Sequence, residues 1–126
     1  MTFGEVIVAA RAQANLSQRE LAARIKNRDG KPISSQYLND VERSRRNPPR
    51  PHLIEQLAAE LRIPPAVLYF HAGRLPPEAA VIAASEQTIV KAYTVLLTIL
   101  RDGHEPGDRD GHEPGDRDGQ ERANVQ

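Results

Sequence analysis

The sequence contains neither cysteine nor tryptophan among its 126 residues. Without cysteine, the chain cannot form disulfides, thiolate metal sites or cysteine nucleophiles. Its longest apolar-rich stretch, Thr88–Leu100, is interrupted by Lys91 and is too short to span a bilayer. The N-terminus lacks the basic start and the long apolar run of a signal peptide. These absences predict a soluble protein of a reducing compartment with no membrane segment.

Net charge is also absent, because 17 basic and 17 acidic side chains cancel, but the charges are unevenly placed. Residues 1–100 hold 13 basic and 9 acidic side chains, whereas residues 101–126 hold 4 and 8. The acidic end contains GHEPGDRD twice, at 103–110 and 111–118. Gly, Pro and mixed charge at this density cannot bury enough apolar surface to offset the entropy of ordering. We therefore predict a disordered charged tail over 102–126.

Three helix starts are indicated by hydroxyl side chains, two of them with a carboxylate three residues later. Thr2 precedes Glu5, and Ser17 precedes Glu20, by the three residues of a capping box. Ser34 marks a third start, because it lies just before a run of helical apolar spacing. The expected helices run from Thr2 to Ala14, from about Ser17, from about Ser34, over Pro51–Leu61 and from Pro64-Pro65 to Ala72-Gly73. No stretch alternates with the period of a strand, so we predict an all-α domain over residues 1–75.

The third helix, Ser34–Arg43, has two unlike faces when its residues are placed on a helical wheel. Apolar side chains fill one half, together with Ser34 and Tyr37. The other half carries short or planar hydrogen-bonding groups, namely Ser35, Gln36, Asn39, Asp40 and Arg43. Side chains of this kind bind base edges in the major groove of DNA. The residues alone leave an ordinary solvated polar face equally open.

Arginines crowd the segment that follows this helix, at Arg43, Arg45, Arg46 and Arg50. Guanidinium groups form charge-assisted, often bidentate hydrogen bonds with phosphate oxygens. The pattern favours contact with a nucleic-acid backbone, although a basic surface loop has the same composition.

Two segments, LSQRELAARI at 16–25 and ISSQYLNDVERSRRNPP at 33–49, resemble the Cro/C1-type helix-turn-helix family of phage and bacterial regulators, also called the XRE family. The resemblance covers about residues 3–75. It implies a five-helix, lambda-repressor-like domain that binds double-stranded DNA with its third helix in the major groove. It also implies a cytoplasmic protein of bacterial or phage origin.

The resemblance further implies roles for individual side chains. Ser35, Gln36 and Asn39 would face bases, with Asp40 and Arg43 at the edge of the same contact. Backbone phosphates would be held by Gln18, Ser34, Arg45 and Arg46. The basic residues Lys31 and Arg50, to which the resemblance assigns no role, are expected to add phosphate contacts. Arg11 and Glu42 would form an internal ion pair that joins the first helix to the third.

The sequence departs from the family's pattern at two places. KNRDGKP, residues 26–32, replaces the usual tight turn between the second and third helices and is several residues longer. Its Lys26, Arg28 and Lys31 favour additional phosphate contacts, with a solvated loop as the alternative. Ser44 stands where the family commonly has glycine, which requires either a left-handed residue or a different exit from the third helix.

A further helix is expected over 78–101, within a second segment that covers 76–101. Its apolar stripe consists of Ile82, Glu86, Ile89, Tyr93, Leu96 and Leu100, which alternate steps of four and three residues. This is the seam spacing of paired helices, weakened near its start by the polar glutamate. We expect the dimer contact of a homodimer at Ile89, Tyr93, Leu96 and Leu100. The alternative is that the helix folds back onto the first domain.

These features predict a sequence-specific, homodimeric DNA-binding transcriptional regulator. The resemblance to the family, and no particular residue, implies that it is a repressor. The alternative from another class is an antitoxin or adaptor that keeps the fold and holds a protein partner through its C-terminal helix. We predict no enzyme, because no paired carboxylates, nucleophile–base spacing or Gly-rich phosphate loop stands out. The repeats place histidines beside carboxylates, but a metal site needs a framework that fixes its ligands, so we assign no metal and no cofactor.

Overall fold

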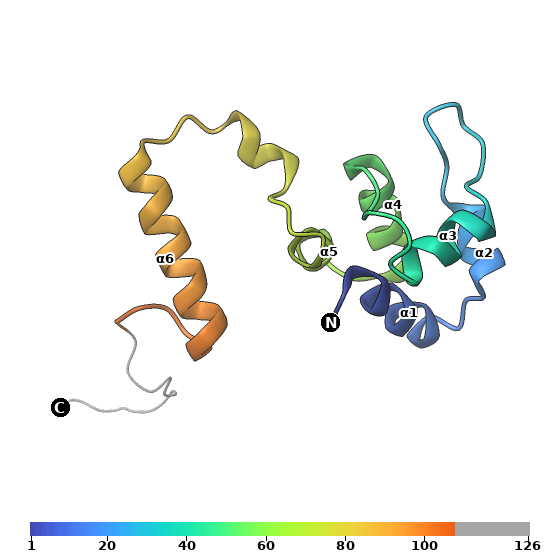
Figure 1. Ribbon diagram of the computed structural model, residues 1–126, viewed down its shortest axis with the longest axis horizontal. Helices are drawn as coiled ribbons and strands as arrows, with labels where there is room; N and C mark the ends of the chain where they lie inside the picture. The colour runs from blue at the N-terminus through green and yellow to red at the C-terminus, as the bar shows by residue number, and fades with distance from the viewer. Residues whose placement is uncertain (108–126) are drawn as a thin grey trace. The chain divides into compact units, whose positions relative to one another are not determined.

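The computed structural model of the protein describes residues 1–107 and divides into two compact units. The first unit comprises residues 1–82, and the second begins at Ala83. The helices, in chain order, are α1 Phe3–Gln13, α2 Gln18–Arg24, α3 Ser35–Glu42, α4 Pro51–Leu61, α5 Pro65–His71, the 3-10 helix η1 Pro77–Val81 and α6 Glu86–Asp102 (Figure 1). Within the described residues there is no strand, only an isolated antiparallel bridge between Lys26 and Pro32. The all-α prediction is confirmed.

Side-chain caps begin the first three helices where the sequence predicts them. Thr2 Oγ1 accepts from Glu5 N at 3.1 Å, and Glu5 Oε1 accepts from Thr2 N at 2.8 Å. Ser17 starts α2 with the same capping box, and the Ser34 hydroxyl accepts from a backbone N–H in the first turn of α3. Each bond satisfies an N–H that has no partner within its own helix. The three predicted starts are confirmed.

Left-handed residues end α1 and α3. Asn15 has a φ of 56° and Ser44 a φ of 59°. Just beyond Ser44, Arg45 N donates to Asp40 O at 2.8 Å and satisfies a carbonyl at the end of α3. Of the two alternatives at Ser44, the structure therefore shows the left-handed residue, in the conformation that glycine adopts at lowest cost.

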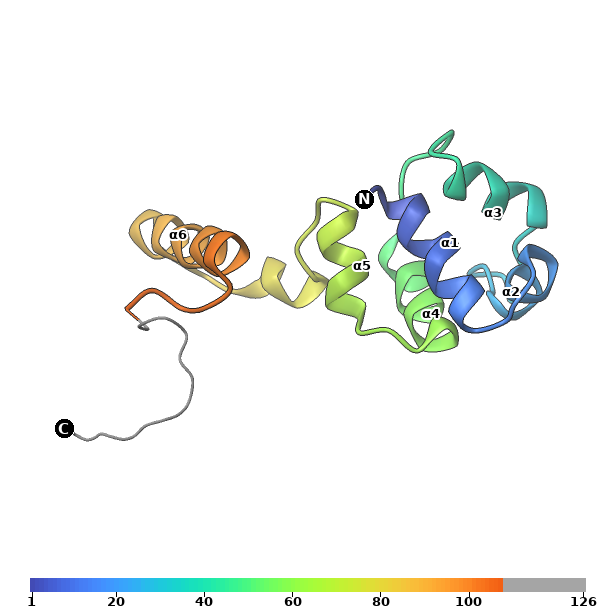
Figure 2. The same cartoon turned by 90° about the horizontal axis from the view of Figure 1, so that it is seen from below.

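The first unit has one apolar core, to which all five of its α-helices contribute. Its fully buried large side chains are Ile7, Leu21, Ile25, Leu38, Ile54, Leu57, Leu68 and Tyr69. α1 packs against α3 and α5, α2 packs against α3, and α4 packs against α5 (Figure 2). Burial of one such aliphatic side chain contributes about 2 kcal/mol. Because α3 gives Leu38 and Val41 to this core, its other face is left to solvent.

A polar network joins α1, α2 and α3 around the carboxylate of Glu42, whose side chain is only 3% exposed. Arg11 Nε donates to Glu42 Oε2 at 2.8 Å, and Arg11 Nη2 donates to Glu42 Oε1 at 3.0 Å. Gln18 Nε2 adds a third bond to Oε1 at 2.7 Å. Arg11 Nη1 also donates to the carbonyl of Leu16 at 3.0 Å. The buried charge is thus paired and hydrogen-bonded, as burial of a carboxylate requires.

The start of α1 lies directly against the end of α3. A Cβ atom added at Gly4 would lie 2.2 Å from Glu42 O and 2.7 Å from Val41 O. Both are backbone atoms, so no side chain could move aside to make room. Only glycine allows α1 to approach α3 this closely, because it alone lacks Cβ.

The second unit contains α6, and the helix expected over 78–101 is wrong at its start. Residues 77–81 form the separate turn η1, and α6 begins at Glu86. The physical reason is the cap: the Ser85 hydroxyl accepts from Thr88 N at 3.1 Å. Ile82 consequently lies outside the helix and outside its apolar stripe.

α6 ends at Asp102, and Gly103 follows it with a left-handed φ of 82°. The tail predicted over 102–126 lies outside the described residues from 108 onward. Between residues 1 and 107, no helix has both the length and the apolar content needed to cross a bilayer.

The ion pair predicts a strong coupling between Arg11 and Glu42. We expect Arg11→Met to lower the free energy of unfolding by about 3 kcal/mol, because it leaves a buried carboxylate uncompensated. The double variant Arg11→Met/Glu42→Met removes both charges and should recover most of that loss. Urea unfolding of the wild type, both single variants and the double variant measures the coupling. Strictly additive losses would contradict it.

The contact at Gly4 predicts that replacing this glycine with alanine lowers the free energy of unfolding, although the same replacement usually stabilises a helix. A change from glycine to alanine inside a helix normally stabilises by about 1 kcal/mol. We expect Gly4→Ala to destabilise instead, by about 2 kcal/mol, because the new methyl group collides with backbone. The reverse change at an exposed position of the same helix, Ala9→Gly, reports ordinary propensity and serves as the control. A more stable Gly4→Ala protein in thermal unfolding would refute the close approach.

Candidate nucleic-acid interface

One face of α3 is open to solvent, while the other belongs to the core. Ser35, Gln36 and Arg43 are exposed, and Asn39 and Asp40 are half-buried. Four of the five side chains predicted to meet bases therefore lie on the eight-residue helix α3, and the fifth, Arg43, is the C-cap residue of that helix. We call these five residues the α3 polar face.

Internal bonds orient most of the α3 polar face. Gln36 Nε2 donates to Asp40 Oδ1 at 3.0 Å, and the same oxygen lies 3.8 Å from Arg45 Nη1. Asn39 Oδ1 accepts from Gln18 Nε2 at 3.0 Å. Side chains that are already ordered lose less conformational entropy when a ligand binds. The polar face is therefore preorganised rather than loosely solvated.

Gln18 has a connecting role that the sequence does not reveal. It is the first residue of α2, and its half-buried side chain reaches α3, where Nε2 bonds both Asn39 and Glu42. These partners are 21 and 24 residues away along the chain, so no local pattern marks them. Since the side-chain amide donates inward, a phosphate contact at Gln18 would use its free backbone N–H at the helix start.

Ser34 and Lys31 lie at the N-terminal end of α3. The Ser34 hydroxyl accepts from Tyr37 N at 3.0 Å and so already serves as the helix cap. The first backbone N–H groups of α3 remain directed toward its N-terminal side, where the helix dipole favours anions. Lys31 is exposed three residues before this cap.

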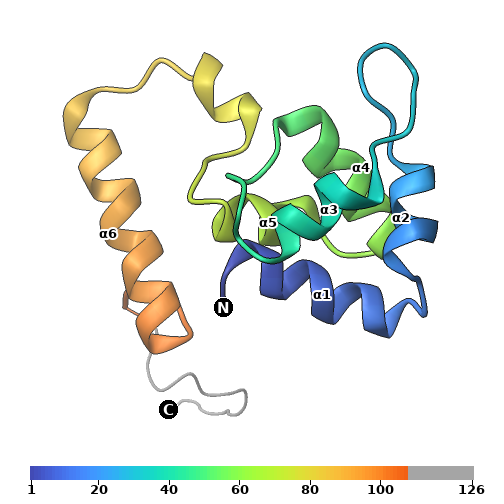
Figure 3. The ribbon, with the colours of Figure 1, turned by 45° about the vertical axis from the view of Figure 1, so that its right-hand side comes forward.

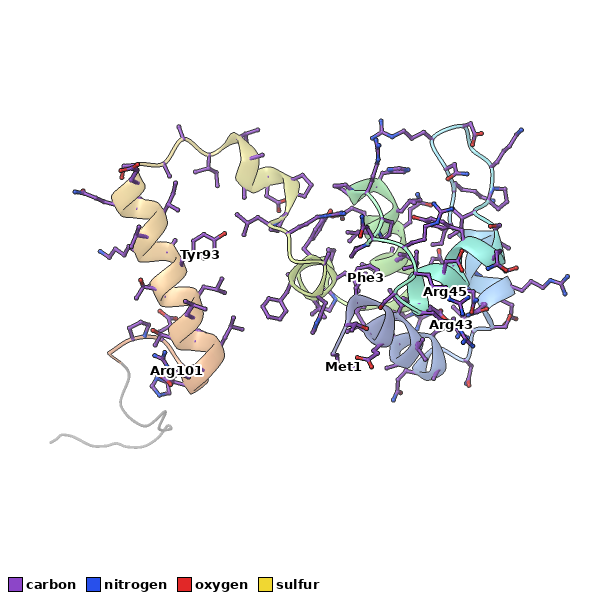
Figure 4. All side chains as sticks on the ribbon, in the orientation of Figure 1. Met1, Phe3, Arg43, Arg45, Tyr93 and Arg101 are labelled. Carbon is purple, nitrogen blue, oxygen red and sulfur yellow. The ribbon has the colours of Figure 1, made fainter. Side chains whose placement is uncertain are left out.

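The arginines that follow α3 are exposed and differ in their surroundings. Figure 4 labels Arg43 and Arg45 near the carboxyl end of α3, and the Arg45 side chain is 60% exposed. Arg46 lies over Tyr37, with its guanidinium carbon 5.3 Å from the ring centroid. Burial raises the pKa of Tyr37, so the phenol is neutral beside this cation. The cation–π contact positions Arg46 without neutralising its charge.

Arg74 positions the loop that carries these arginines, a role that the sequence analysis did not assign to it. Its Nη2 donates to Pro48 O at 2.8 Å, and its Nη1 donates to Pro49 O. Proline carbonyls are strong acceptors, and these two would otherwise lie in a partly buried loop without a partner. No local signal identifies Arg74, because its partners lie 25 and 26 residues earlier in the chain.

The interface consists of hydrogen-bonding and cationic groups. Across residues 1–107, His, Asp and Glu side chains do not gather in any group of three that could hold a metal ion. What the described arrangement offers is a preorganised polar helix face bordered by exposed guanidinium groups.

Comparison with known protein families gives one match. The profile of the family described as helix-turn-helix matches residues 7–68, from the first turns of α1 into α5. No curated protein and no solved structure matched the chain. The matched residues contain the α2–α3 pair, the polar network and the α3 polar face. Residues 7–68 are thus a DNA-binding helix-turn-helix domain of the Cro/C1-type, or XRE, family of regulators.

Proposed function

We propose that the protein is a sequence-specific transcriptional repressor that binds DNA as a homodimer with α3 in the major groove. The observation that carries this proposal is the preorganised α3 polar face. Ser35, Gln36 and Asn39 offer the donors and acceptors that distinguish base pairs. Asp40 and Arg43 lie at the edge of the same contact and complete the footprint on the bases.

Phosphate contacts surround this face and set the register of α3 in the groove. We assign them to Gln18, Ser34, Lys31, Arg45, Arg46 and Arg50. The exposure of the three arginines supports the assignment, as does the cation–π contact that holds one of them in place. Backbone N–H groups at the starts of α2 and α3 add dipolar attraction for the same anions.

A homodimer through α6 is supported by the apolar stripe of this helix. No residue of α6 is buried, and its large apolar side chains are exposed as follows: Ile89 46%, Tyr93 47%, Leu96 38% and Leu100 52%. They repeat at coiled-coil spacing, which a second copy of the same helix complements. Two copies would also double a footprint that is small for one domain, with half-sites about one helical turn apart.

Repression follows most simply from these two surfaces. A dimer bound across a promoter excludes other proteins from the same DNA, and it needs only the α3 polar face and the α6 stripe to do so. Activation would require a further surface that contacts the transcription machinery.

The division between base and phosphate contacts predicts two different mutant phenotypes. Ser35→Ala/Gln36→Ala/Asn39→Ala should lower the preference for a selected duplex over a mixed-sequence duplex about tenfold or more. Arg45→Ala/Arg46→Ala should weaken both duplexes alike and reduce the slope of log affinity against log salt by about 2. Fluorescence anisotropy over a salt series, with duplexes selected from a random pool, measures both effects. Identical behaviour of the two variants would refute the assignment, and affinity that is independent of salt would refute the DNA contact itself.

The α6 stripe predicts that charge at its centre separates the dimer. We expect Tyr93→Glu/Leu96→Glu to sediment as a monomer and to bind a palindromic selected duplex about 100-fold more weakly, because the second half-site is no longer tethered. Lys91→Glu changes charge on the side of α6 opposite Ile89 and should leave the dimer intact. A wild-type protein that sediments as a monomer at micromolar concentration would contradict the homodimer.

A further inference from the structure

Residues 26–32 form a hairpin that is closed by an antiparallel bridge between Lys26 and Pro32, and not an irregular loop (Figure 3). Its base closes where Ile33 N donates to Ile25 O at 2.9 Å, and the next rung joins Asn27 N to Lys31 O at 2.7 Å. The turn ends on Gly30, whose φ of 82° favours glycine. Ile25 and Ile33 are both buried, so the hairpin leaves the core and returns to it at neighbouring points.

α4 anchors this hairpin from the side. Gln56 Oε1 accepts from Lys26 N at 2.7 Å, and Gln56 Nε2 donates to Lys26 O at 2.8 Å. The side-chain amide of Gln56 thus pairs with the hairpin backbone as another strand would. An anchored element presents its side chains with less entropy to lose on binding than a free loop would.

The exposed side chains of the hairpin are predominantly cationic. Lys26, Arg28 and Lys31 are all exposed, and Asp29 is the single acid among them. Asp29 Oδ1 accepts from Lys31 N at 3.1 Å, so this carboxylate closes the turn. None of the ion pairs within residues 1–107 includes any of these three cations.

A cleft of about 720 Å³ lies between the hairpin and the loop that follows α3. Asn27 and Pro32 of the hairpin line one side, and Arg46 and Arg50 line the other. No carboxylate lines this cleft. His52 lines it as well, and its buried Nδ1 has no hydrogen-bond partner. The cleft therefore suits an anion, and its size exceeds that of a single ion.

We propose that this cleft holds a stretch of DNA backbone and that Lys26, Arg28 and Lys31 contact the phosphates next to it. The proposal rests on the proposed function and extends it, because the hairpin would carry the footprint beyond the bases read by α3. A phosphodiester chain is an anion of repeating charge, so it can occupy a cleft that has Arg46 and Arg50 on one wall and continue past it along the cations of the hairpin. The hairpin then adds affinity and length of footprint without reading sequence.

The test is the salt dependence of binding to a mixed-sequence duplex. We expect Lys26→Gln/Arg28→Gln/Lys31→Gln to reduce the slope of log affinity against log salt by about 2 to 3 and to weaken binding at low salt roughly 10- to 100-fold. The control Arg62→Gln/Lys91→Gln/Arg101→Gln removes the same charge from exposed positions outside the hairpin and should leave the slope unchanged. Equal slopes for the two variants would overturn the proposal.

Three further readouts separate this proposal from the proposed function. The hairpin variant should keep the wild-type preference for a selected duplex and should shorten the hydroxyl-radical footprint at its outer edge. An unshortened footprint would overturn the hairpin contact while leaving DNA recognition by α3 intact, and a lost preference would overturn the claim that the hairpin binds without reading sequence. A wild type that binds no duplex at any salt would overturn the proposed function as well.

A substitution inside the cleft tests its occupant. Asn27→Asp changes little volume but places a carboxylate in the cleft, so it should weaken mixed-sequence and selected duplexes alike, whereas Asn27→Ala should do so much less. If Asn27→Asp leaves DNA binding unchanged and abolishes binding of inorganic phosphate instead, the cleft holds a small anion and the proposal is wrong.

Discussion

The arrangement of α1, α2 and α3, and with it the orientation of the α3 polar face, depends on the carboxylate of Glu42. It accepts two bonds from Arg11 on α1 and one from Gln18 on α2, while its own residue ends α3. Three helices are therefore fixed to one another by a single buried charge. Because an unpaired carboxylate in this position would be costly, the three helices are held together strongly. The network also continues outward, since the Gln18 amide that bonds Glu42 also bonds Asn39 on the polar face.

The eight residues of α3 contribute both to the apolar core and to the exposed polar face. Leu38 and Val41 are buried, so the helix cannot rotate without exposing apolar surface, and its polar face is fixed in consequence. The close approach at Gly4 adds a steric limit, because α1 backbone lies against the last turn of α3. Recognition by such a helix needs little rearrangement, since packing on one side determines what the other side presents.

The longer α2–α3 connection does not disturb this arrangement. Ile25 and Ile33 are both buried and are joined by a backbone hydrogen bond, so the chain re-enters the core beside the point where it leaves. The additional residues extend outward as a hairpin, and Gln56 holds the hairpin against α4. An insertion at this place therefore adds surface to the domain while the helix pair keeps its contacts. α6 belongs to a second unit, within which its apolar stripe has no packing partner.

The sequence by itself determined the features that depend on neighbours a few residues apart. The capping boxes at Thr2 and Ser17, the cap at Ser34 and the two faces of α3 all follow from spacings within one or two helical turns. The ion pair of Arg11 with Glu42 came from the resemblance to a family, and the structure places its atoms. Tertiary structure alone decided the inward turn of the Gln18 amide, the clamp of Arg74 on the loop, the need for glycine at position 4 and the anchoring of the hairpin by Gln56. Each of these joins residues more than 20 positions apart, and such contacts arise from packing, which no local pattern encodes.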